Sequence, residues 1–267
     1  MTLLVDQAER LLGRRVAAAR RLSGGDLSAT FHLTLAEGGA IIAKRAPNAP
    51  AEAAMLRAIE VTDAPVPFVR AAEGDLLLMD AIAHDGGIAS AWPDLARVLG
   101  LLHGAIGNRY GWAEDHGFGA VAIQNGWMDD WPAFWAERRL RCHLPHVGAD
   151  IGRRIERLAD RLADLLPARP PAALLHGDLW GGNILVAGNR VAALIDPACY
   201  YGDREVDVAM LSLFDHPPPN FLDALDLAPG WRARQPAYRL WPLLVHLRLF
   251  GPSYREPVNN ALAALGC

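Results

Sequence analysis

Residues 174–186 read LLHGDLWGGNILV, an apolar run that holds a His, an Asp, a Trp, two Gly and an Asn. A buried strand would not carry these groups without a reason, because burying a polar group without a partner costs roughly 2–7 kcal/mol. The run continues as AGNRVAALID, where Gly188-Asn189 predicts the turn of a β-hairpin between two strand-like runs. The polar residues therefore occupy a turn directly before a hairpin.

Three oxygen-bearing side chains flank this hairpin. Asn183 follows Asp178 by five positions, and Asp196, at the end of the second strand, follows Asp178 by 18. One carboxylate that takes a proton from an attacking hydroxyl, with an amide and a second carboxylate that hold Mg²⁺ against nucleotide phosphates, suits phosphoryl transfer. The same layout is typical of the protein-kinase catalytic loop and metal-binding Asp. The alternative is that Asp178 and Asn183 only cap a turn through local hydrogen bonds.

The N-terminal region favours the phosphoryl-transfer interpretation. Lys44 lies on a strand-like run and Glu52 on the helical pattern that follows it. In kinases a strand Lys paired with a helix Glu contacts the α- and β-phosphates. Taken alone, Lys44 is equally typical of a solvated strand, and Glu52 of a first-turn carboxylate favoured by the helix dipole. The segment SGGDLSATF, 23–31, lacks a full G-x-G-x-x-G motif, so its Gly24-Gly25 pair indicates either a phosphate-covering turn or an ordinary hairpin turn.

The hydrophobic pattern predicts an α+β fold with two lobes. An amphipathic helix at the N-terminus precedes three β-prone runs that predict an antiparallel meander, then an Ala-rich helix at 49–62 and a strand in DLLLMDAI, 75–82. From residue 93 the pattern is mostly helical, including single long helices expected over 131–144 and 150–167. We therefore expect a small sheet lobe over residues 1–80 and a helical lobe over residues 81–267.

Composition excludes several classes of protein. Of 267 residues, 52% are apolar, which is ample for a packed core, and the formal net charge of -4 argues against nucleic-acid binding. Three scattered cysteines indicate neither a disulfide framework nor a zinc site, and they predict a cytoplasmic protein. No stretch approaches the 18 apolar residues of a membrane-spanning helix, so we expect no membrane partner.

Four segments together resemble the fructosamine kinase (ketosamine-3-kinase) family, relatives of the aminoglycoside phosphotransferases. They are HGDLWGGN at 176–183, DPACYYGDREVDVAM at 196–210, QNGWMDDWPAFWAERRL at 124–140 and LWPLLVHLRLFGPSY at 240–254. The Trp after His-Gly-Asp-Leu separates this family from the aminoglycoside and choline kinases. The resemblance covers nearly the whole chain and implies a protein-kinase-like bilobal fold and an ATP-dependent phosphotransferase.

The resemblance also implies roles for single residues. Asp178 would be the catalytic base, Asn183 and Asp196 would bind Mg²⁺, and Lys44 with Glu52 would form the nucleotide ion pair. Adenine would bind the backbone of the connector around Asp80 to Ile82, and the Gly24-Gly25 turn would cover the phosphates of ATP.

Trp180 is the first candidate for sugar binding, because an aromatic face beside the base packs on the apolar side of a sugar or its amine. The alternative is a core Trp, since Trp is highly buried on average. Asn125 and Trp127 are further substrate candidates on the same grounds.

Other polar residues are expected to be structural. We interpret Tyr201, Asp203, Arg204 and Glu205 as structural, with the Asp-Arg-Glu cluster forming an ion-pair network that braces the metal loop. His103 and His246 lie in helical apolar stretches and are expected to line the core.

The expected reaction is phosphorylation of the sugar 3-hydroxyl of a ketosamine, a deglycation or repair activity. One alternative is a related kinase of the aminoglycoside or choline kinase type that acts on another hydroxyl, and a second is a catalytically silent nucleotide-binding or scaffold protein. The sequence leaves open which ketosamine is used, whether its amine belongs to a protein or a metabolite, and the oligomeric state.

Overall fold

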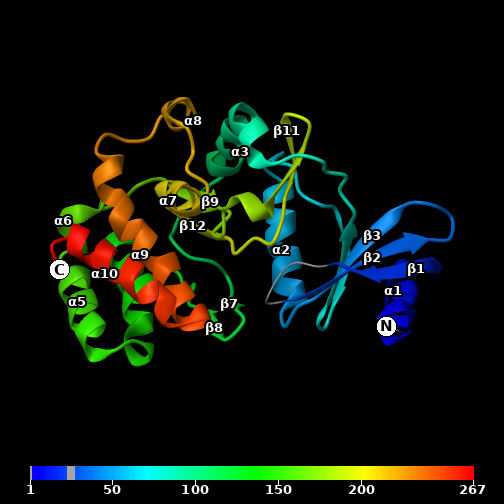
Figure 1. Ribbon diagram of the computed structural model, residues 1–267, viewed down its shortest axis with the longest axis horizontal. Coiled ribbons are helices and arrows are strands. Elements are labelled where there is room, and N and C mark those ends of the chain that lie inside the picture. The colour runs from blue at the N-terminus through cyan, green and yellow to red at the C-terminus, as the bar shows by residue number, and fades with distance from the viewer. Residues whose placement is uncertain (1, 23–27) are drawn as a thin grey trace. The chain divides into compact units, whose positions relative to one another are not determined.

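The computed structural model describes residues 2–22 and 28–267. The chain divides into two compact units (Figure 1). The N-terminal unit comprises Met1–Ala91 and Asn183–Pro197, and the C-terminal unit comprises Trp92–Gly182 and Ala198–Cys267. The compact units thus separate after residue 91 and place the 183–197 hairpin with the N-terminal sheet. The functional lobes expected over residues 1–80 and 81–267 stay a prediction.

The N-terminal unit is built on a five-stranded antiparallel sheet in the order β1-β2-β3-β5-β4. The strands are β1 (Val16–Arg21), β2 (Ala29–Leu35), β3 (Ala40–Arg45), β4 (Val69–Glu73) and β5 (Leu76–Asp80). The predicted meander is confirmed as β1-β2-β3. The short strand β4, VRAAE, was not predicted, because it carries too few β-branched or aromatic residues to stand out.

Helices cover both faces of this sheet. On one face Leu76 and Leu78 of β5 pack with residues of α1 (Thr2–Leu12). On the other face Leu77 and Met79 pack with residues of α2 (Ala49–Glu60). Because side chains alternate along a strand, a strand buried on both faces is apolar at every position, as LLLM is. The same alternation puts Lys44 of β3 on the face opposite Ala43, which packs on the α1 side.

A hairpin of β10 (Ile184–Ala187) and β11 (Arg190–Leu194) completes the N-terminal unit, with the predicted turn at Gly188-Asn189. It is held by backbone hydrogen bonds from Asp85 and Gly86 N–H to the Val186 carbonyl, each 3.0 Å, and from Leu194 N–H to the Pro65 carbonyl, 2.8 Å. The hairpin is therefore hydrogen-bonded to chain segments that precede it by roughly 100 to 130 residues.

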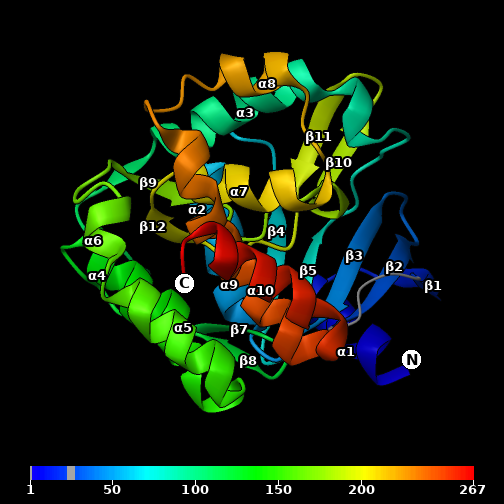
Figure 2. The same cartoon turned by 60° about the vertical axis from the view of Figure 1, so that its left-hand side comes forward.

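The C-terminal unit is mostly helical, which confirms the α+β class. Its helices are α3 (Trp92–Gly104), α4 (Trp131–Phe134), α5 (Ala149–Ala159), α6 (Leu162–Leu165), α7 (Glu205–Phe214), α8 (Pro219–Ala224), α9 (Trp231–Phe250) and α10 (Arg255–Ala264). A small sheet in the order β12-β9-β6 comprises β6 (Ile106–Gly107), β9 (Ala172–Leu175) and β12 (Tyr200–Gly202), and β7 (His116–Phe118) pairs with β8 (Val121–Ile123). Helices α9 and α10 lie side by side (Figure 2).

The prediction of one long α-helix over residues 131–144 is wrong. The segment is an α-helical turn, α4, followed by a π-helix, Trp135–Leu140, and a 3₁₀ helix, Arg141–His146. Arg139 of the π-helix is fully buried against the rings of Phe134, Tyr200 and Trp241, at 4.8, 4.1 and 4.9 Å. Its guanidinium also donates to the Gln124 carbonyl at 2.6 Å. Most of these contacts of Arg139 are with residues distant in the sequence, so the local apolar periodicity does not reveal that the helix changes its form here.

The single helix predicted over residues 150–167 is also wrong, because it divides into α5 and α6. Ile151, Ile155, Leu158 and Leu162 are all buried, so one apolar face continues across the break. At the break the Asp160 carboxylate accepts a hydrogen bond from Arg141 at 2.6 Å. The apolar period that predicted one helix is therefore present, but it does not reveal the interruption.

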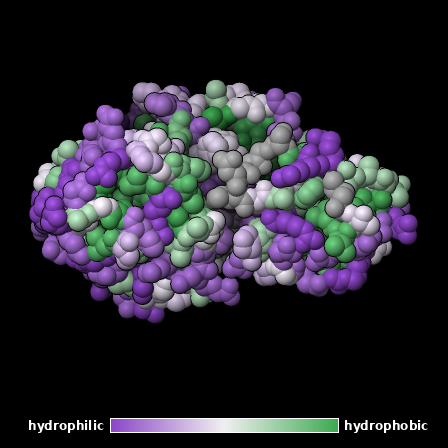
Figure 3. Space-filling model, turned by 60° about the horizontal axis from the view of Figure 1, so that its bottom comes forward, coloured by the Kyte–Doolittle hydropathy of each residue, from purple (hydrophilic) through white to green (hydrophobic). Residues whose placement is uncertain are grey.

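On the face drawn in Figure 3, hydrophilic residues interrupt the apolar patches. Several large apolar side chains of the described residues reach the surface. They include Phe68, Trp127, Trp180 and Phe250. None of the helices in residues 2–22 and 28–267 combines the length and the apolar run that a bilayer crossing requires.

Candidate functional site

The N-terminal unit contains a buried ammonium group held by two carboxylates. Lys44 Nζ lies 2.8 Å from both carboxylate oxygens of Glu52 and 3.0 Å from Asp196 Oδ1. Lys44 and Glu52 are 6% and 4% exposed, whereas the side chain of Asp196 is 39% exposed. The structure therefore brings together three of the residues singled out in the sequence, from β3, α2 and the end of the hairpin.

Local signals in the sequence place Glu52 opposite Lys44. Asn48 caps α2 and its side chain accepts a hydrogen bond from the Ala51 N–H at 3.4 Å, while Pro50 lies in the first turn, where no intrahelical N–H bond is lost. Glu52 lies in this first turn, on the buried side of the helix. A negative charge at this end of a helix is favoured by the helix dipole.

The balance of burial and charge keeps Lys44 protonated. Burial by itself lowers the pKa of an ammonium, but the charges of Glu52 and Asp196 outweigh it and raise the pKa of Lys44 above its ordinary value. Removing one partner of such a buried pair leaves an uncompensated charge, which typically costs about 3–5 kcal/mol. The arrangement therefore holds a permanent positive charge of the kind that binds phosphate oxygens.

Asn183 and Asp196 lie at the open end of the β10-β11 hairpin. Ile184 pairs with Leu194, and the next residue, Ile195, donates its N–H to the Asn183 carbonyl at 3.0 Å. Asp196 follows directly and has a left-handed backbone, φ 55°, which is uncommon for a residue other than glycine and typical of functional positions. The hairpin thus brings one amide, Asn183, and one carboxylate, Asp196, to its open end.

Two oxygen-bearing side chains are too few to enclose a metal ion with protein ligands alone, but they suit magnesium. Within residues 2–22 and 28–267 no group of three or more His, Cys, Asp and Glu side chains is placed to hold a metal ion. Mg²⁺ is usually bound by one or two protein carboxylates or amides, with waters and substrate phosphates completing its six ligands. Asn183 and Asp196 match that donor set.

In the C-terminal unit, the turn after β9 carries His176, Gly177 and Asp178. Hydrogen bonds to a buried carboxylate hold this turn in place. Asp207 of α7, fully buried, accepts hydrogen bonds from the backbone N–H groups of His176 and Gly177, each at 2.9 Å. His103 Nε2 lies 2.9 Å from the same carboxylate. Burial opposes ionisation, but these bonds lower the pKa of Asp207, so it stays charged.

Asp207 was not predicted, although the sequence contains a signal for it. It stands in the apolar run EVDVAMLSLF, and a carboxylate in a buried run requires partners. His103 lies in the core, as expected, and it has a specific polar partner there.

Gly177 gives the turn its shape. Its φ is +79°, and a Cβ at this position would lie 2.0 Å from the Ala198 carbonyl oxygen. The Ala198 N–H in turn donates to the His176 carbonyl at 2.9 Å. Asp178, half-buried, donates its N–H to His176 Nδ1 at 3.3 Å. The backbone that leads into Asp178 is therefore fixed.

Trp180 is 41% exposed, which contradicts the alternative of a core Trp. Its six-membered ring lies against Gly182, where a Cβ would be 2.3 Å from the ring edge, and its centroid is 6.3 Å from that of Phe214. One part of the indole is thus supported and another part is open to a ligand.

Trp127 and Asn125 differ in accessibility although they are neighbours. Trp127 is 39% exposed, with its ring centroid 6.2 Å from that of Tyr201. Asn125 is fully buried, and its side-chain oxygen accepts from Arg139 at 2.8 Å while its amide donates to the Glu114 carbonyl at 3.2 Å. A substrate contact by the Asn125 side chain would require it to leave these partners.

The remaining predicted nucleotide residues lie in the N-terminal unit. Asp80 ends β5 and forms a two-point ion pair with Arg70, at 2.6 and 2.8 Å. The Ile82 carbonyl lies 3.0 Å from His84 Nδ1. Gly24 and Gly25 lie outside the described residues, so their predicted role stays a prediction.

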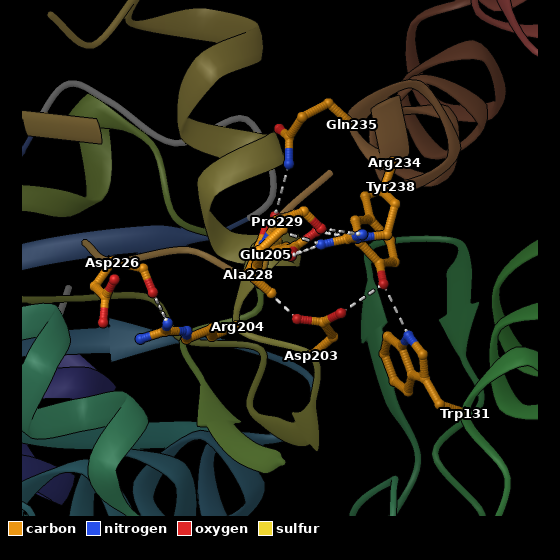
Figure 4. Close-up of polar contacts among 10 residues, drawn as sticks. All are labelled: Trp131, Asp203, Arg204, Glu205, Asp226, Ala228, Pro229, Arg234, Gln235 and Tyr238. Atoms are coloured by element: carbon orange, nitrogen blue, oxygen red, sulfur yellow. Dashed lines mark hydrogen bonds and ion pairs between the residues drawn. The ribbon is translucent and has the colours of Figure 1, made fainter. Parts of the chain in front are cut away.

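The segment 203–205 is braced by α9 (Figure 4). Glu205 accepts two hydrogen bonds from Arg234, at 2.8 and 2.6 Å. Asp203 accepts from the Tyr238 hydroxyl at 2.7 Å, and that hydroxyl accepts from Trp131 Nε1 at 2.9 Å. The acidic residues expected to act as braces thus do so through α9.

Arg204 points the other way in the same view, toward the carbonyl of Asp226 (Figure 4). It is not paired with the neighbouring Asp203 or Glu205. The Asp-Arg-Glu run is therefore three separate attachments, not an internal ion-pair network.

We predict that Asp203 makes folding sensitive to pH. Burial, reinforced by the charge of Glu205, raises the pKa of Asp203 to about 6. The folded state then binds more protons than the unfolded state between pH 4 and 6, so this group destabilises the fold as pH rises through that window. Between pH 4 and 7 the wild type should lose about 2 kcal/mol of unfolding free energy relative to Asp203→Asn.

Urea unfolding at several pH values measures this difference, and Asp226→Asn, at an exposed position, serves as the matched control. Parallel pH profiles of wild type and Asp203→Asn would contradict the raised pKa.

Comparison with known sequences identifies a family. The sequence profile described as fructosamine kinase matches residues 3–265. A probable ketoamine kinase of Synechocystis sp. is 32% identical, covering 93% of this chain and 90% of that protein. A probable ketoamine kinase of Escherichia coli K12 is 31% identical, covering 96% and 97%.

Comparison with solved structures agrees on the fold. A Thermobifida fusca protein described as a "putative fructosamine-3-kinase" superposes with a TM-score of 0.91, at 30% identity, covering 99% of this chain and 98% of that one. The aminoglycoside phosphotransferase APH(4)-Ia superposes with a TM-score of 0.67 at 15% identity, covering 99% and 97%. The latter likeness shows the fold alone and confirms the predicted protein-kinase-like architecture.

Proposed function

The chain belongs to the fructosamine kinase family, an ATP-dependent phosphotransferase family, and from that premise we propose that it phosphorylates the sugar 3-hydroxyl of ketosamines. A ketosamine is a ketose joined through carbon 1 to an amine. The observation that carries the proposal is the buried Lys44 ammonium between Glu52 and Asp196, because it supplies a fixed cation for nucleotide phosphates in a chain matched to this family over residues 3–265.

The proposed step is a direct transfer. The substrate hydroxyl oxygen forms a bond to the γ-phosphorus, the bond from that phosphorus to the oxygen of ADP breaks, and the hydroxyl proton passes to the Asp178 carboxylate. The fixed backbone around Asp178 supports this role, because a base is effective only when its position is held. The neighbouring Trp180 ring would pack on the sugar.

The N-terminal unit would hold the nucleotide. Lys44 would contact the α- and β-phosphates while Glu52 keeps its ammonium in place. Asn183 and Asp196 would bind Mg²⁺, which when bound neutralises charge on the transferring phosphoryl group. The roles proposed for Gly24, Gly25, Asp80 and Ile82 rest on the family resemblance.

The proposed biological role is deglycation. A phosphate on carbon 3, next to the carbonyl carbon, makes the adduct labile, so that the amine is released. We place the protein in the cytoplasm, where the thiols of Cys142, Cys199 and Cys267, which form no disulfide in the described residues, would stay reduced.

The experiment is ADP release with Mg-ATP and lysine ketosamines made from fructose, ribulose and erythrulose, beside kanamycin and choline. Saturable turnover on a ketosamine alone is the expected result, with phosphorus–proton NMR coupling that locates the phosphate on carbon 3. Turnover only on kanamycin or choline would favour a kinase of another hydroxyl. The absence of metal-dependent ATP turnover on every acceptor would favour a silent nucleotide-binding protein.

Replacing Asp178 by Asn should lower kcat by at least about 100-fold, the typical contribution of a positioned general base, and leave the affinity for ATP within a few-fold of wild type. The exposed carboxylate of Asp164 allows a matched control, Asp164→Asn, which should keep wild-type kinetics. Initial rates and ATP calorimetry measure both effects. Wild-type kcat in Asp178→Asn would show that another group takes the proton.

A further inference from the structure

This inference rests on the proposed function. A kinase of ketosamines has an acceptor site that must distinguish a ketosamine from a free ketose. The two differ at carbon 1, where the ketosamine carries a basic secondary amine that is protonated near neutral pH. Three carbon atoms separate that nitrogen from the 3-hydroxyl oxygen. A site selective for ketosamines therefore benefits from a carboxylate close to the base, on the side where carbon 1 would lie.

Asp215 places a carboxylate against the turn that bears Asp178. It follows the last residue of α7, and its Oδ2 accepts the Gly181 N–H at 2.7 Å. A Cβ on Gly181 would lie 2.3 Å from Asp215 Oδ1, so the carboxylate fills the space that a side chain at position 181 would take. Glycine at 181 is thus explained by Asp215, not by a left-handed backbone.

The chain limits how far Asp215 can lie from Asp178. Gly181 is three residues beyond Asp178, and three residues span at most about 11 Å when fully extended. The half-buried Asp215 carboxylate, bonded to Gly181, therefore belongs to the same short stretch of chain as the proposed base, a separation compatible with one small acceptor between them.

The neighbourhood also suits a cation. The exposed ring of Trp180 belongs to the same turn, and Phe214, beside Asp215 in the chain, lies 6.3 Å from it, centroid to centroid. An ammonium gains from an aromatic face as well as from a carboxylate.

Other carboxylates near these elements are already occupied. Asp207 contacts the same turn but is fully buried and bonded to His103 and two backbone N–H groups. Asp129, beside Trp127, is paired with Arg109 at 2.7 Å. Among the described residues Asp215 takes part in no ion pair, and a carboxylate that accepts one N–H keeps further acceptor capacity for a cation.

We propose that Asp215 binds the protonated amine of the ketosamine and so sets the preference of the enzyme for amine-bearing ketoses. The hydrogen bond to Gly181 holds the carboxylate at the turn that carries Asp178, and the ring of Trp180 packs beside the same ammonium.

The test compares two acceptors that differ in one atom, 1-deoxy-1-propylaminofructose and its neutral ether, 1-O-propylfructose. We expect the wild type to prefer the amine in kcat/KM. Asp215→Asn keeps an oxygen that can accept the Gly181 N–H, and it should lower kcat/KM for the amine by about 10- to 100-fold, mainly through KM, while the amine-to-ether ratio collapses. Asp223→Asn, an exposed carboxylate on α8, is the matched control and should keep the wild-type ratio.

Each outcome decides the proposal. An equal loss on both acceptors in Asp215→Asn, or an unchanged ratio, would overturn it, since a residue that only caps Gly181 affects both acceptors alike. A wild type without preference for the amine would also overturn it but leave the proposed kinase function standing. A wild type inactive on both acceptors would sink the proposed function as well. If Asp215→Asn fails to fold, Asp215→Ser is judged by the same ratio.

Discussion

The arrangement of the N-terminal unit depends on one buried ammonium. Lys44 lies under 10% exposed between a carboxylate from α2 and a carboxylate from the end of the hairpin. An ammonium in such a place is tolerated only when it is paired and hydrogen-bonded. Segments separated by more than a hundred residues in the sequence are thereby tied to one point. The buried carboxylate, Glu52, fixes the ammonium, and the more exposed one, Asp196, is left able to meet a ligand.

The C-terminal unit uses the same physics around a buried anion. Asp207 accepts the backbone N–H groups of His176 and Gly177 and so holds the turn that carries Asp178, the proposed base. In both units a buried charged group, which must be paired, positions the segment that carries the candidate site residues. Apolar side chains pack around it. Deleting such a partner leaves a buried charge uncompensated, so it should displace the segment as well as destabilise the fold.

The sequence predicted what depends on short-range patterns. The meander, the Gly188-Asn189 hairpin and α2 follow from alternation, turn residues and helix signals, and they bring Lys44, Glu52 and Asp196 together. The family resemblance is confirmed by the profile match, and the roles proposed for those residues come from that resemblance. The π-helix at Arg139, the break before α6 and the bond from Gly181 to Asp215 escaped prediction. Each depends on a partner distant in the chain, and local periodicity carries no information about it.

The central claim is that Lys44, fixed by its carboxylates, binds the nucleotide phosphates. The most direct measurement is calorimetric affinity for Mg-ATP and for adenosine in wild type and in Lys44→Met/Glu52→Gln, a pair of changes that leaves no buried Glu52 carboxylate without its lysine. We expect at least about a 10-fold loss of ATP affinity, with adenosine binding unchanged, because a charge-assisted bond to phosphate is typically worth about 1.5–3 kcal/mol. Wild-type affinity for ATP in the double variant would contradict it.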